Sequence, residues 1–234
     1  MQKKALPNSP KTIDGTPAST SSATRMVCAS QPPLRVYSLS QTAAASAIGM
    51  ATAIASRIAK AGHTVEVITR DTHKAQELAD KLASGATTGA YGALPTGDIV
   101  IIAVPYSSVA AVVADFGDAL DGKLIIDIAN PVAPDLSGLV TPPGSSGAQE
   151  TAKRLPTGAH VVKAFNTIFG HVLAKGGRLD AFIAADDADA KARVSIFLES
   201  LGLRPFDVGG LQMAQTLEAL GLMMIGLAKN GAGT

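Results

Sequence analysis

From Leu34 onward, short apolar runs rich in β-branched residues alternate with Ala-rich segments whose apolar residues recur three or four positions apart. This alternation is typical of βαβ units and predicts an α/β fold with a doubly wound, mostly parallel sheet. Seven strands are expected, at residues 35–39, 63–69, 98–104, 123–128, 160–165, 180–185 and 203–208. The runs DIVIIAV and KLIIDI are almost continuously apolar, so these two strands should be central, with helices covering both faces.

Helices are expected at residues 51–62, 72–83, 187–202 and 211–228, and a further helix is expected to start within residues 103–109. The first places Ile54 and Ile58 on one face and ends at Gly62, a suitable residue for a helix C-terminus. The last is apolar around much of its circumference, which favours burial by another domain or subunit, and we expect a homodimer that packs these helices together. Its most apolar part, residues 217–228, is shorter than the roughly 18 residues that span a bilayer, so no membrane segment is expected.

Two segments depart from the alternating pattern. Residues 129–150 contain four prolines and are long for a connection in a compact domain, which favours a lid or a wall of a substrate site over a tolerated surface insertion. Residues 1–34 are rich in Ser, Thr and Pro without apolar periodicity, so we expect a disordered arm, with a targeting segment as the alternative. The folded domain is therefore expected at residues 35–234.

Composition excludes several classes of function. Twenty Lys and Arg balance nineteen Asp and Glu, and no basic stripe is interleaved with aromatic residues, so no nucleic-acid partner is expected. Cys28 is the only cysteine, which excludes an intramolecular disulfide or a Cys-rich metal site and suits a cytoplasmic location. Four scattered histidines show neither metal-ligand spacing nor a Ser/His/Asp order, so we expect no metal centre and no catalytic nucleophile.

The region before the first helix bears on dinucleotide binding. A dinucleotide-binding turn carries three glycines, for a tight turn, for close approach of the backbone to the pyrophosphate, and for helix packing. Counting back from Gly62, these positions fall on Ser46, Ile48 and Ala51, of which only Ala51 is an accepted substitute. The β-branched Ile48 stands where a phosphate needs bare backbone.

Phosphate binding does not strictly require glycine. Free N–H groups at a helix N-terminus attract an anion whatever the side chains are, so Ile48, Gly49 and Met50 are candidate cofactor-binding residues. Alternatively, the turn is enlarged, or the helix begins early, near Ser40 or Thr42, with those hydroxyls as caps.

The second strand ends in VITRD, which bears on the choice of cofactor. NAD-binding domains usually carry an acidic residue at this point, which binds the ribose hydroxyls. Here Thr69 and Arg70 occupy it, with Lys74 one turn on, and a hydroxyl with two cations suits the 2′-phosphate of NADP. The alternative is an ordinary solvated charge at a strand end. Asp71 is then expected to cap the following helix.

Three later strands end in turns that contain Pro or Asn. In a doubly wound sheet the carboxyl ends of the strands form the binding crevice. Val104, Pro105 and Tyr106 follow one strand, Asn130 the next, and Asn166 the third, so all should lie at that edge. For any one of them a structural role in the turn is an equal alternative.

The chain resembles a known family in six motifs. In order, these are RIAKAGHTVEVITRD, DIVIIAVPYSSV, LIIDIANPV, VVKAFNTIFG, FIAADDADAKARV and LGLRPFDVGGLQMAQTLEALGLMMIGLA. Together they resemble the NADP oxidoreductases that depend on the deazaflavin coenzyme F420, and also related reductase domains such as the cytosolic part of six-transmembrane metalloreductases. The resemblance covers residues 35–234. It implies a Rossmann domain with a small C-terminal helical part, and hydride transfer between NADP(H) and a deazaflavin or flavin.

The same resemblance implies where the cofactor would lie. It assigns Thr69, Arg70 and Lys74 to the 2′-phosphate, Val104, Pro105 and Tyr106 to the cofactor lining, and Asn130, Ala164 and Asn166 to the surroundings of the nicotinamide. Hydride transfer between two redox cofactors needs positioning and exclusion of water but no nucleophile, so no catalytic side chain is expected.

Two other functions are compatible with parts of the sequence. A non-catalytic or weakly binding Rossmann-fold protein, acting as a binding or assembly partner, would explain the missing glycines. Reduction of an imine is compatible with the N-terminal fold, but the stretch after Val208 is short for the helical dimerisation domain of such enzymes. We therefore expect an NADP-dependent oxidoreductase with a small-molecule redox cofactor as its partner.

Overall fold

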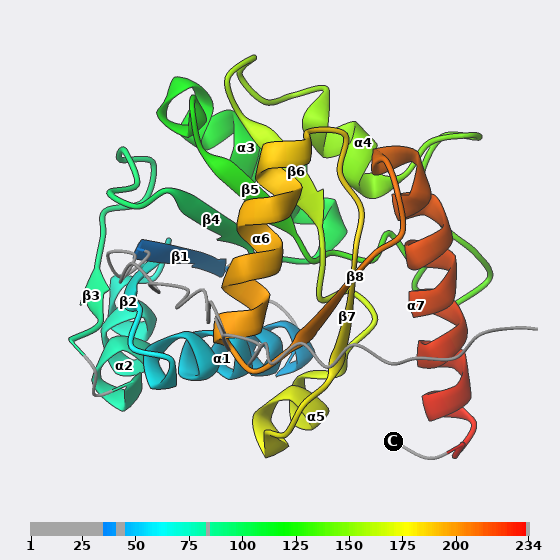
Figure 1. The fold of residues 1–234 in the computed structure, drawn as a ribbon, viewed down its shortest axis with the longest axis horizontal. Coiled ribbons are helices and arrows are strands. Elements are labelled where there is room, and N and C mark those ends of the chain that lie inside the picture. Colours follow the sequence, from blue (N-terminus) through cyan, green and yellow to red (C-terminus); the bar gives the residue numbers. More distant parts are fainter. Residues whose placement is uncertain (1–34, 41–44, 83–84, 233–234) are drawn as a thin grey trace, which may run out of the picture. The chain divides into compact units, whose positions relative to one another are not determined.

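The protein is described here by a computed structural model that places residues 35–40, 45–82 and 85–232, with side chains from Gly49 onward (Figure 1). The chain divides into two units, Met1–Gln31 and Pro32–Thr234, and all the described residues belong to the second unit. The arm expected over residues 1–34 lies outside the described residues, so its predicted disorder stays a prediction.

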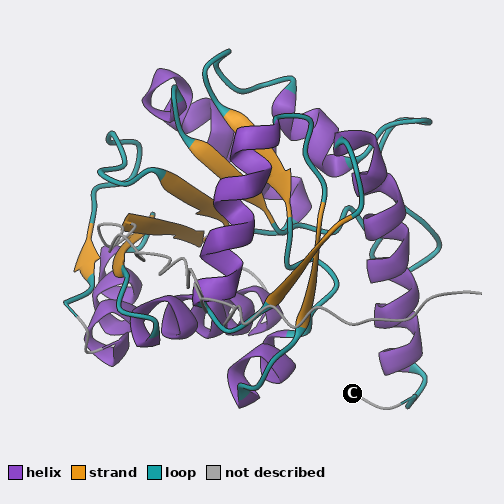
Figure 2. Cartoon of the chain, in the orientation of Figure 1, coloured by secondary structure: helices purple, strands orange, loops and turns teal. Residues whose placement is uncertain are grey.

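Six strands form one parallel sheet in the order β3-β2-β1-β4-β5-β6 (Figures 1 and 2). The strands are β1 (Arg35–Ser40), β2 (Thr64–Thr69), β3 (Thr87–Thr88), β4 (Ile99–Ile102), β5 (Leu124–Asp127) and β6 (His160–Lys163). The chain extends the sheet from β1 first in one direction and then in the other, which is the order of a doubly wound Rossmann sheet. The predicted fold class is confirmed.

Helices cover both faces of this sheet. They are α1 (Ala45–Lys60), α2 (Thr72–Leu82), α3 (Tyr106–Phe116), α4 (Gly147–Ala152), α5 (Gly170–Lys175), α6 (Ala188–Ser200) and α7 (Ala214–Lys229), with the 3₁₀ turns η1 (Gly117–Leu120) and η2 (Leu211–Met213). One hydrophobic core joins the sheet to α1, α2 and α6, and a second joins its other face to α3. The sheet is therefore the middle layer of three.

Strand β4 shows why the central runs are apolar throughout. Ile99 and Ile101 belong to the core under α1 and α6, whereas Val100 and Ile102 belong to the core under α3, and all four are 0% exposed. Because successive side chains point to opposite faces, a strand covered on both faces needs an apolar residue at every position. The predicted central position of β4 and β5 is confirmed by the strand order.

Two predicted strands leave the main sheet. β7 (Asp180–Ile183) and β8 (Arg204–Asp207) are strands as expected, but they pair in parallel with each other in a two-stranded sheet. A single antiparallel bridge between Lys163 and Ala184 joins β6 to the segment that follows β7. After β8, the last strand of the small sheet, the chain continues through η2 into α7 (Figure 2).

Helix α7 is less buried than its sequence predicts. Leu217, Glu218 and Gly221 are buried in its first half, whereas Met223 is 56% and Leu227 49% exposed. The expectation of a buried helix is wrong for the second half, because that half extends past the sheet (Figure 1). The longer stretch of residues 211–229 is long and apolar enough to span a membrane by length and composition alone, with a mean hydropathy of 1.3, so the expected absence of a membrane segment stays a prediction.

Candidate functional site

The turns that follow β4, β5 and β6 surround one cavity of about 460 Å³. Val104, Pro105, Asn130 and Asn166, predicted to share this edge of the sheet, all line it, and Met50 of α1 lines it as well. Parallel strands place their carboxyl ends at one edge, which is why residues some 60 positions apart meet here. Most of the lining is apolar, as is usual for a pocket that holds a flat ring.

Asn130 and Asn166 form a polar pair in the cavity wall. The Asn166 Nδ2 donates to Asn130 Oδ1 over 2.9 Å and to the backbone oxygen of Leu217 over 2.8 Å, and Asn130 Nδ2 donates to Asn166 O over 2.8 Å. The remaining amide oxygen, Asn166 Oδ1, is buried and has no hydrogen-bond partner among the described residues. Since buried acceptors are nearly always paired, this oxygen is a candidate for a donor supplied by a ligand.

A tight turn at the end of β6 directs Asn166 toward the cavity. Phe165 has a φ of 61°, and the Asn166 N–H donates to the Ala164 carbonyl over 2.8 Å, which closes a three-residue γ-turn. A bulky residue takes up such a φ at a conformational cost, and Phe165 is held in it by complete burial. Ala164, predicted to lie beside the nicotinamide, is fully buried and is not among the residues that line the cavity.

Helix α7 supplies the wall opposite the sheet. Gly221, Met224 and Ile225 line the cavity, and a Cβ atom at position 221 would lie 2.5 Å from Asn130 Oδ1. Only glycine allows the helix to approach the turn after β5 this closely. Gly221, Met224 and Ile225 were not among the residues predicted for the site, although two glycines in an apolar helix are a sign of close packing.

Beneath the cavity lies a fully buried cluster of three charges. The Lys163 ammonium lies 3.1 Å from Asp127 Oδ1 and 2.8 Å from Glu218 Oε1, and it also donates to the Ala129 carbonyl. All three charged side chains are at most 1% exposed. Lysine, aspartate and glutamate are almost never buried unless paired, so charged residues inside otherwise apolar runs were the signal available in the sequence.

The start of α1 differs from the glycine count. Helix α1 begins at Ala45, so Ser46, Ile48 and Ala51 belong to the helix and not to the turn. Gly49 and Met50 are the fifth and sixth residues of α1, where the N–H groups bond within the helix and are not available to a phosphate.

The start of α1 lies earlier in the chain than the glycine count implies. The count from the end of the helix misplaced the turn because α1 has sixteen residues. The connection between β1 and α1, residues 41–44, lies outside the described residues, as does the side chain of Ile48. Donors for a pyrophosphate are therefore to be sought at the very start of α1.

The predicted 2′-phosphate residues lie at the end of β2. Arg70 is 52% exposed, its Nη2 lies 2.6 Å from Asp115 Oδ2, and its guanidinium lies over the ring of Tyr91. The hydrogen bond from Arg70 holds the pKa of Asp115 below its usual value. Thr69 donates its hydroxyl to the Asp71 carbonyl. These groups form a charged surface that is separate from the apolar cavity.

The start of α2 carries the third of these residues. Asp71 caps the helix, as predicted, by accepting from the N–H groups of His73 and Lys74 over 3.1 and 3.2 Å. The hydrogen bond from the Lys74 N–H is the largest of the effects that lower the pKa of Asp71. The Lys74 ammonium lies 3.6 Å from Asp71 Oδ2 and is half exposed, so it can also reach a ligand at the end of β2.

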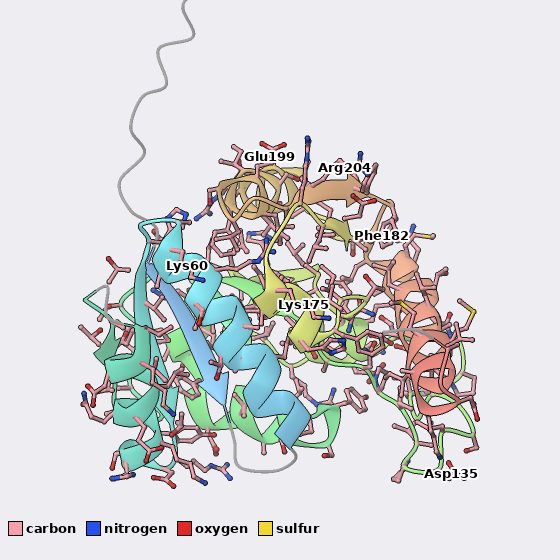
Figure 3. All side chains as sticks on the ribbon, turned by 90° about the horizontal axis from the view of Figure 1, so that it is seen from below. Lys60, Asp135, Lys175, Phe182, Glu199 and Arg204 are labelled. Carbon is pink, nitrogen blue, oxygen red and sulfur yellow. The ribbon has the colours of Figure 1, made fainter. Side chains whose placement is uncertain are left out.

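Two further features lie away from the cavity. Tyr106, the first residue of α3, packs toward Gly147, and burial raises the pKa of its hydroxyl. A larger cavity, of about 1000 Å³, is lined by the ends of α1 and α6 and the start of β8, with Lys60, Glu199 and Arg204 around it (Figure 3). That cavity lies at the edge where strands begin, so it is not part of the site at the carboxyl ends.

Comparison with known proteins decides the family. Residues 47–131 match the model of the family described as NADP oxidoreductase, coenzyme F420-dependent. The chain is 30% identical over 193 residues to the F420-dependent NADP reductase of Methanothermobacter marburgensis, and the match covers 74% of this chain and 85% of that protein. The chain belongs to this family. It is therefore an NADP-dependent oxidoreductase with a Rossmann fold.

Other similar proteins place this oxidoreductase in a wider group. The metalloreductase STEAP3 of Rattus norvegicus is 29% identical over 181 residues, but the chain spans only 35% of its length. The crystal structure of a hypothetical protein from Sinorhizobium meliloti has 26% identity and a TM-score of 0.66, over 78% of this chain and 88% of that one. An imine reductase from Myxococcus stipitatus in complex with NADP⁺, 18% identical with a TM-score of 0.58, covers 86% of this chain and 63% of that one, and shows the fold alone.

The residues of this oxidoreductase fit a bound NADP(H). The cavity at the ends of β4, β5 and β6 is apolar, as a nicotinamide ring requires, and Asn166 Oδ1 is a buried acceptor suited to an amide N–H. Arg70 stands at the end of β2, on the half of the sheet where a Rossmann fold places the ribose of the adenosine. The two ends of the dinucleotide thus have sites of the matching chemistry.

Proposed function

We propose that the protein transfers hydride between NADP(H) and a deazaflavin, flavin or similar redox partner. The observation that carries this proposal is the apolar cavity at the carboxyl ends of β4, β5 and β6, where the Asn130–Asn166 pair meets α7. A mostly apolar cavity with one polar pair in its wall suits flat redox rings. The name of the M. marburgensis relative, an F420-dependent NADP reductase, supports the choice of acceptor.

Hydride transfer from NADPH to a flavin-type ring needs no side chain that gives or takes a proton. Bound NADPH supplies a hydride, which is two electrons and a proton, and a flavin-type ring accepts it together with one proton from solvent. Asn166 orients the nicotinamide by accepting its amide N–H, and Val104 and Pro105 keep water from its ring. Arg70 and Lys74 hold the 2′-phosphate.

Binding and turnover measurements test the proposal. Calorimetry should detect NADPH binding to the folded protein, with weaker binding of NADH, and NADPH oxidation should then be followed with a deazaflavin, FMN and ferric iron offered separately. We expect turnover with a flavin-type acceptor. A folded protein that binds no NADPH would contradict the proposal as a whole, whereas binding with turnover only on ferric iron would contradict the choice of acceptor.

A non-catalytic or weakly binding partner protein was the alternative that the sequence left open, and membership of the reductase family disfavours it. Ser46 and Ile48, at the counted positions of the turn glycines, motivated it, and the structure moves these residues into α1. Ser46 and Ile48 are therefore not the residues of the phosphate turn, and their identity is no argument against phosphate binding. This candidate requires a folded protein that neither binds NADPH nor oxidises it, and the calorimetry above separates the two functions.

The assembly is a further part of the proposal. We infer a cytoplasmic homodimer that packs the exposed half of α7 against a second copy, because Met223 and Leu227 expose large apolar side chains there. Light scattering at micromolar concentration should give the mass of a dimer. Changing both residues to Lys should give a monomer, and a wild-type protein that is already monomeric would contradict the inference.

A further inference from the structure

Within one copy of the chain, the first half of α7 makes most of the contacts of this helix. Only the first half of the helix is buried, around Leu217, Glu218 and Gly221, and the second half carries the exposed Met223 and Leu227. The hydrophobic effect is not directional, so burial of apolar area alone does not select one register of an apolar helix. Something more specific must decide which residues of α7 face the cavity.

The buried charge cluster is the most specific contact that α7 makes. Glu218 Oε1 lies 2.8 Å from the Lys163 ammonium at the end of β6, and that ammonium lies 3.1 Å from Asp127 Oδ1 at the end of β5. All three side chains are at most 1% exposed. A buried charge is tolerated only when it is paired and hydrogen-bonded, so these three groups must stay together.

The other oxygen atoms of the cluster are also occupied. Glu218 accepts from the N–H groups of Gly147 and Ala148, at the start of α4, over 2.9 and 3.2 Å. Asp127 accepts from the Ala129 N–H and the Thr151 hydroxyl, each over 2.9 Å. A different register of α7 would leave Lys163 short of a partner and the start of α4 without its acceptor, and both are buried.

This register decides the wall of the cavity. Gly221 follows Glu218 by three residues, so it lies on the same face of the helix and meets Asn130. One further turn brings Met224 and Ile225 to the cavity. The hydrogen bond from Asn166 to the Leu217 carbonyl supports the same register from the adjacent residue.

We infer that Glu218, through its contacts with Lys163 and the start of α4, is a positioning residue that fixes the register of α7 and so shapes the acceptor side of the cavity. This inference rests on the proposed function, since it assigns α7 to the acceptor and not to the dinucleotide. The adenosine half of the dinucleotide would lie at the end of β2, far along the sheet from Glu218. Loss of the Glu218 contacts should therefore lower kcat/KM for the acceptor much more than it weakens NADPH binding.

Two variants of Glu218 and one control test this division. Glu218→Leu removes the charge and the acceptor, and Glu218→Gln keeps one oxygen for Lys163, while Lys163 stays paired with Asp127 in both. Asp180→Asn makes the same carboxylate-to-amide change in an exposed pair with Arg204 and is the matched control. Each protein is assayed for NADPH affinity, for kcat/KM with FMN, or with a deazaflavin where FMN is not reduced, and for amide hydrogen exchange of residues 214–229.

Glu218→Leu should lower kcat/KM for the acceptor by roughly 10- to 100-fold and speed exchange in α7, while NADPH affinity falls by a much smaller factor. Glu218→Gln should give a smaller loss in the same direction, which keeps the test informative if the leucine variant does not fold. Equal losses for acceptor and NADPH, or wild-type kcat/KM and exchange in both variants, would overturn the inference. If the wild-type protein binds no NADPH, the proposed function fails. Amide hydrogen exchange of α7 in the Glu218 variants then still tests whether Glu218 fixes the register of this helix.

Discussion

Two charged clusters lie along the same edge of the sheet and differ in their exposure. Arg70 and Asp115 form an ion pair with side chains 52% and 39% exposed, at the end of β2. Lys163 and its two carboxylates are at most 1% exposed, beneath the cavity at the ends of β5 and β6. Both clusters bring opposite charges within 3.1 Å, so distance alone does not distinguish them.

Exposure decides what each cluster can do. An exposed pair contributes little to stability because water and salt screen it, and its partners can be exchanged for a phosphate. A buried trio has no solvent to replace a lost partner, so its members hold the surrounding segments in place. The first cluster is therefore suited to ligand binding and the second to positioning.

Removing the cation from the buried cluster should have the largest effect. Lys163→Met leaves Asp127 and Glu218 buried without their cation and should destabilise the protein by about 3–5 kcal/mol. The matched change Arg204→Met, in an exposed pair with Asp180, should cost at most about 1 kcal/mol. Urea unfolding of both variants measures the difference, and equal losses of stability would break the distinction between the clusters.

Removing the cation from the exposed cluster should affect binding instead. Arg70→Gln removes the guanidinium that we propose binds the 2′-phosphate, so it should weaken NADPH binding roughly 10- to 100-fold, with little change in stability. NADH has no 2′-phosphate, so its affinity serves as the control and should stay the same. An equal loss for both dinucleotides would show that Arg70 supports the fold of this edge and does not read the phosphate.

Within α7, two glycines should respond in opposite directions to the same substitution. Gly221→Ala places a methyl group 2.5 Å from Asn130 Oδ1 and should destabilise the protein by about 1–3 kcal/mol. Gly226→Ala meets no atom within 4 Å and should stabilise the helix by about 0.5–1 kcal/mol. Thermal unfolding of both variants provides the measurement. A stabilising Gly221→Ala would mean that α7 does not press on the turn after β5.

The fold could be predicted from the sequence because the sheet is covered on both faces. That coverage demands apolar residues along all of β4 and at the first three positions of β5, and such runs are visible without any tertiary information. Strand β3 and helices α4 and α5 were missed because two to six residues are too few to show a period. The separate pairing of β7 with β8 depends on tertiary contacts, and no local sequence pattern indicates it.

The site was predictable only in part. Asn130 and Asn166 could be assigned because residues that follow parallel strands meet at one edge, whatever their distance in sequence. Glu218 and Gly221 stand out in an apolar helix, but their partners could not be predicted, because Lys163 and Asn130 lie 55 and 91 positions earlier and no local pattern joins them. The phosphate turn was misplaced because the count assumed a helix of usual length, and α1 begins at Ala45.

The smallest expected effect concerns His63, a third polar site, remote from both clusters. Its Nε2 lies 2.7 Å from Ser200 Oγ, its Nδ1 is buried without a partner among the described residues, and burial lowers its pKa. Since the folded pKa is below the unfolded value of 6.5, the unfolded chain binds more protons as the pH falls, and stability drops between about pH 7 and pH 5. In the His63→Gln variant, the midpoint of urea unfolding should differ less between pH 5.5 and pH 7.5 than it does in the wild-type protein. An unchanged difference would mean that the pKa of His63 is the same in the folded protein and in the unfolded chain. Burial at this edge would then be insufficient to disfavour the charged imidazole.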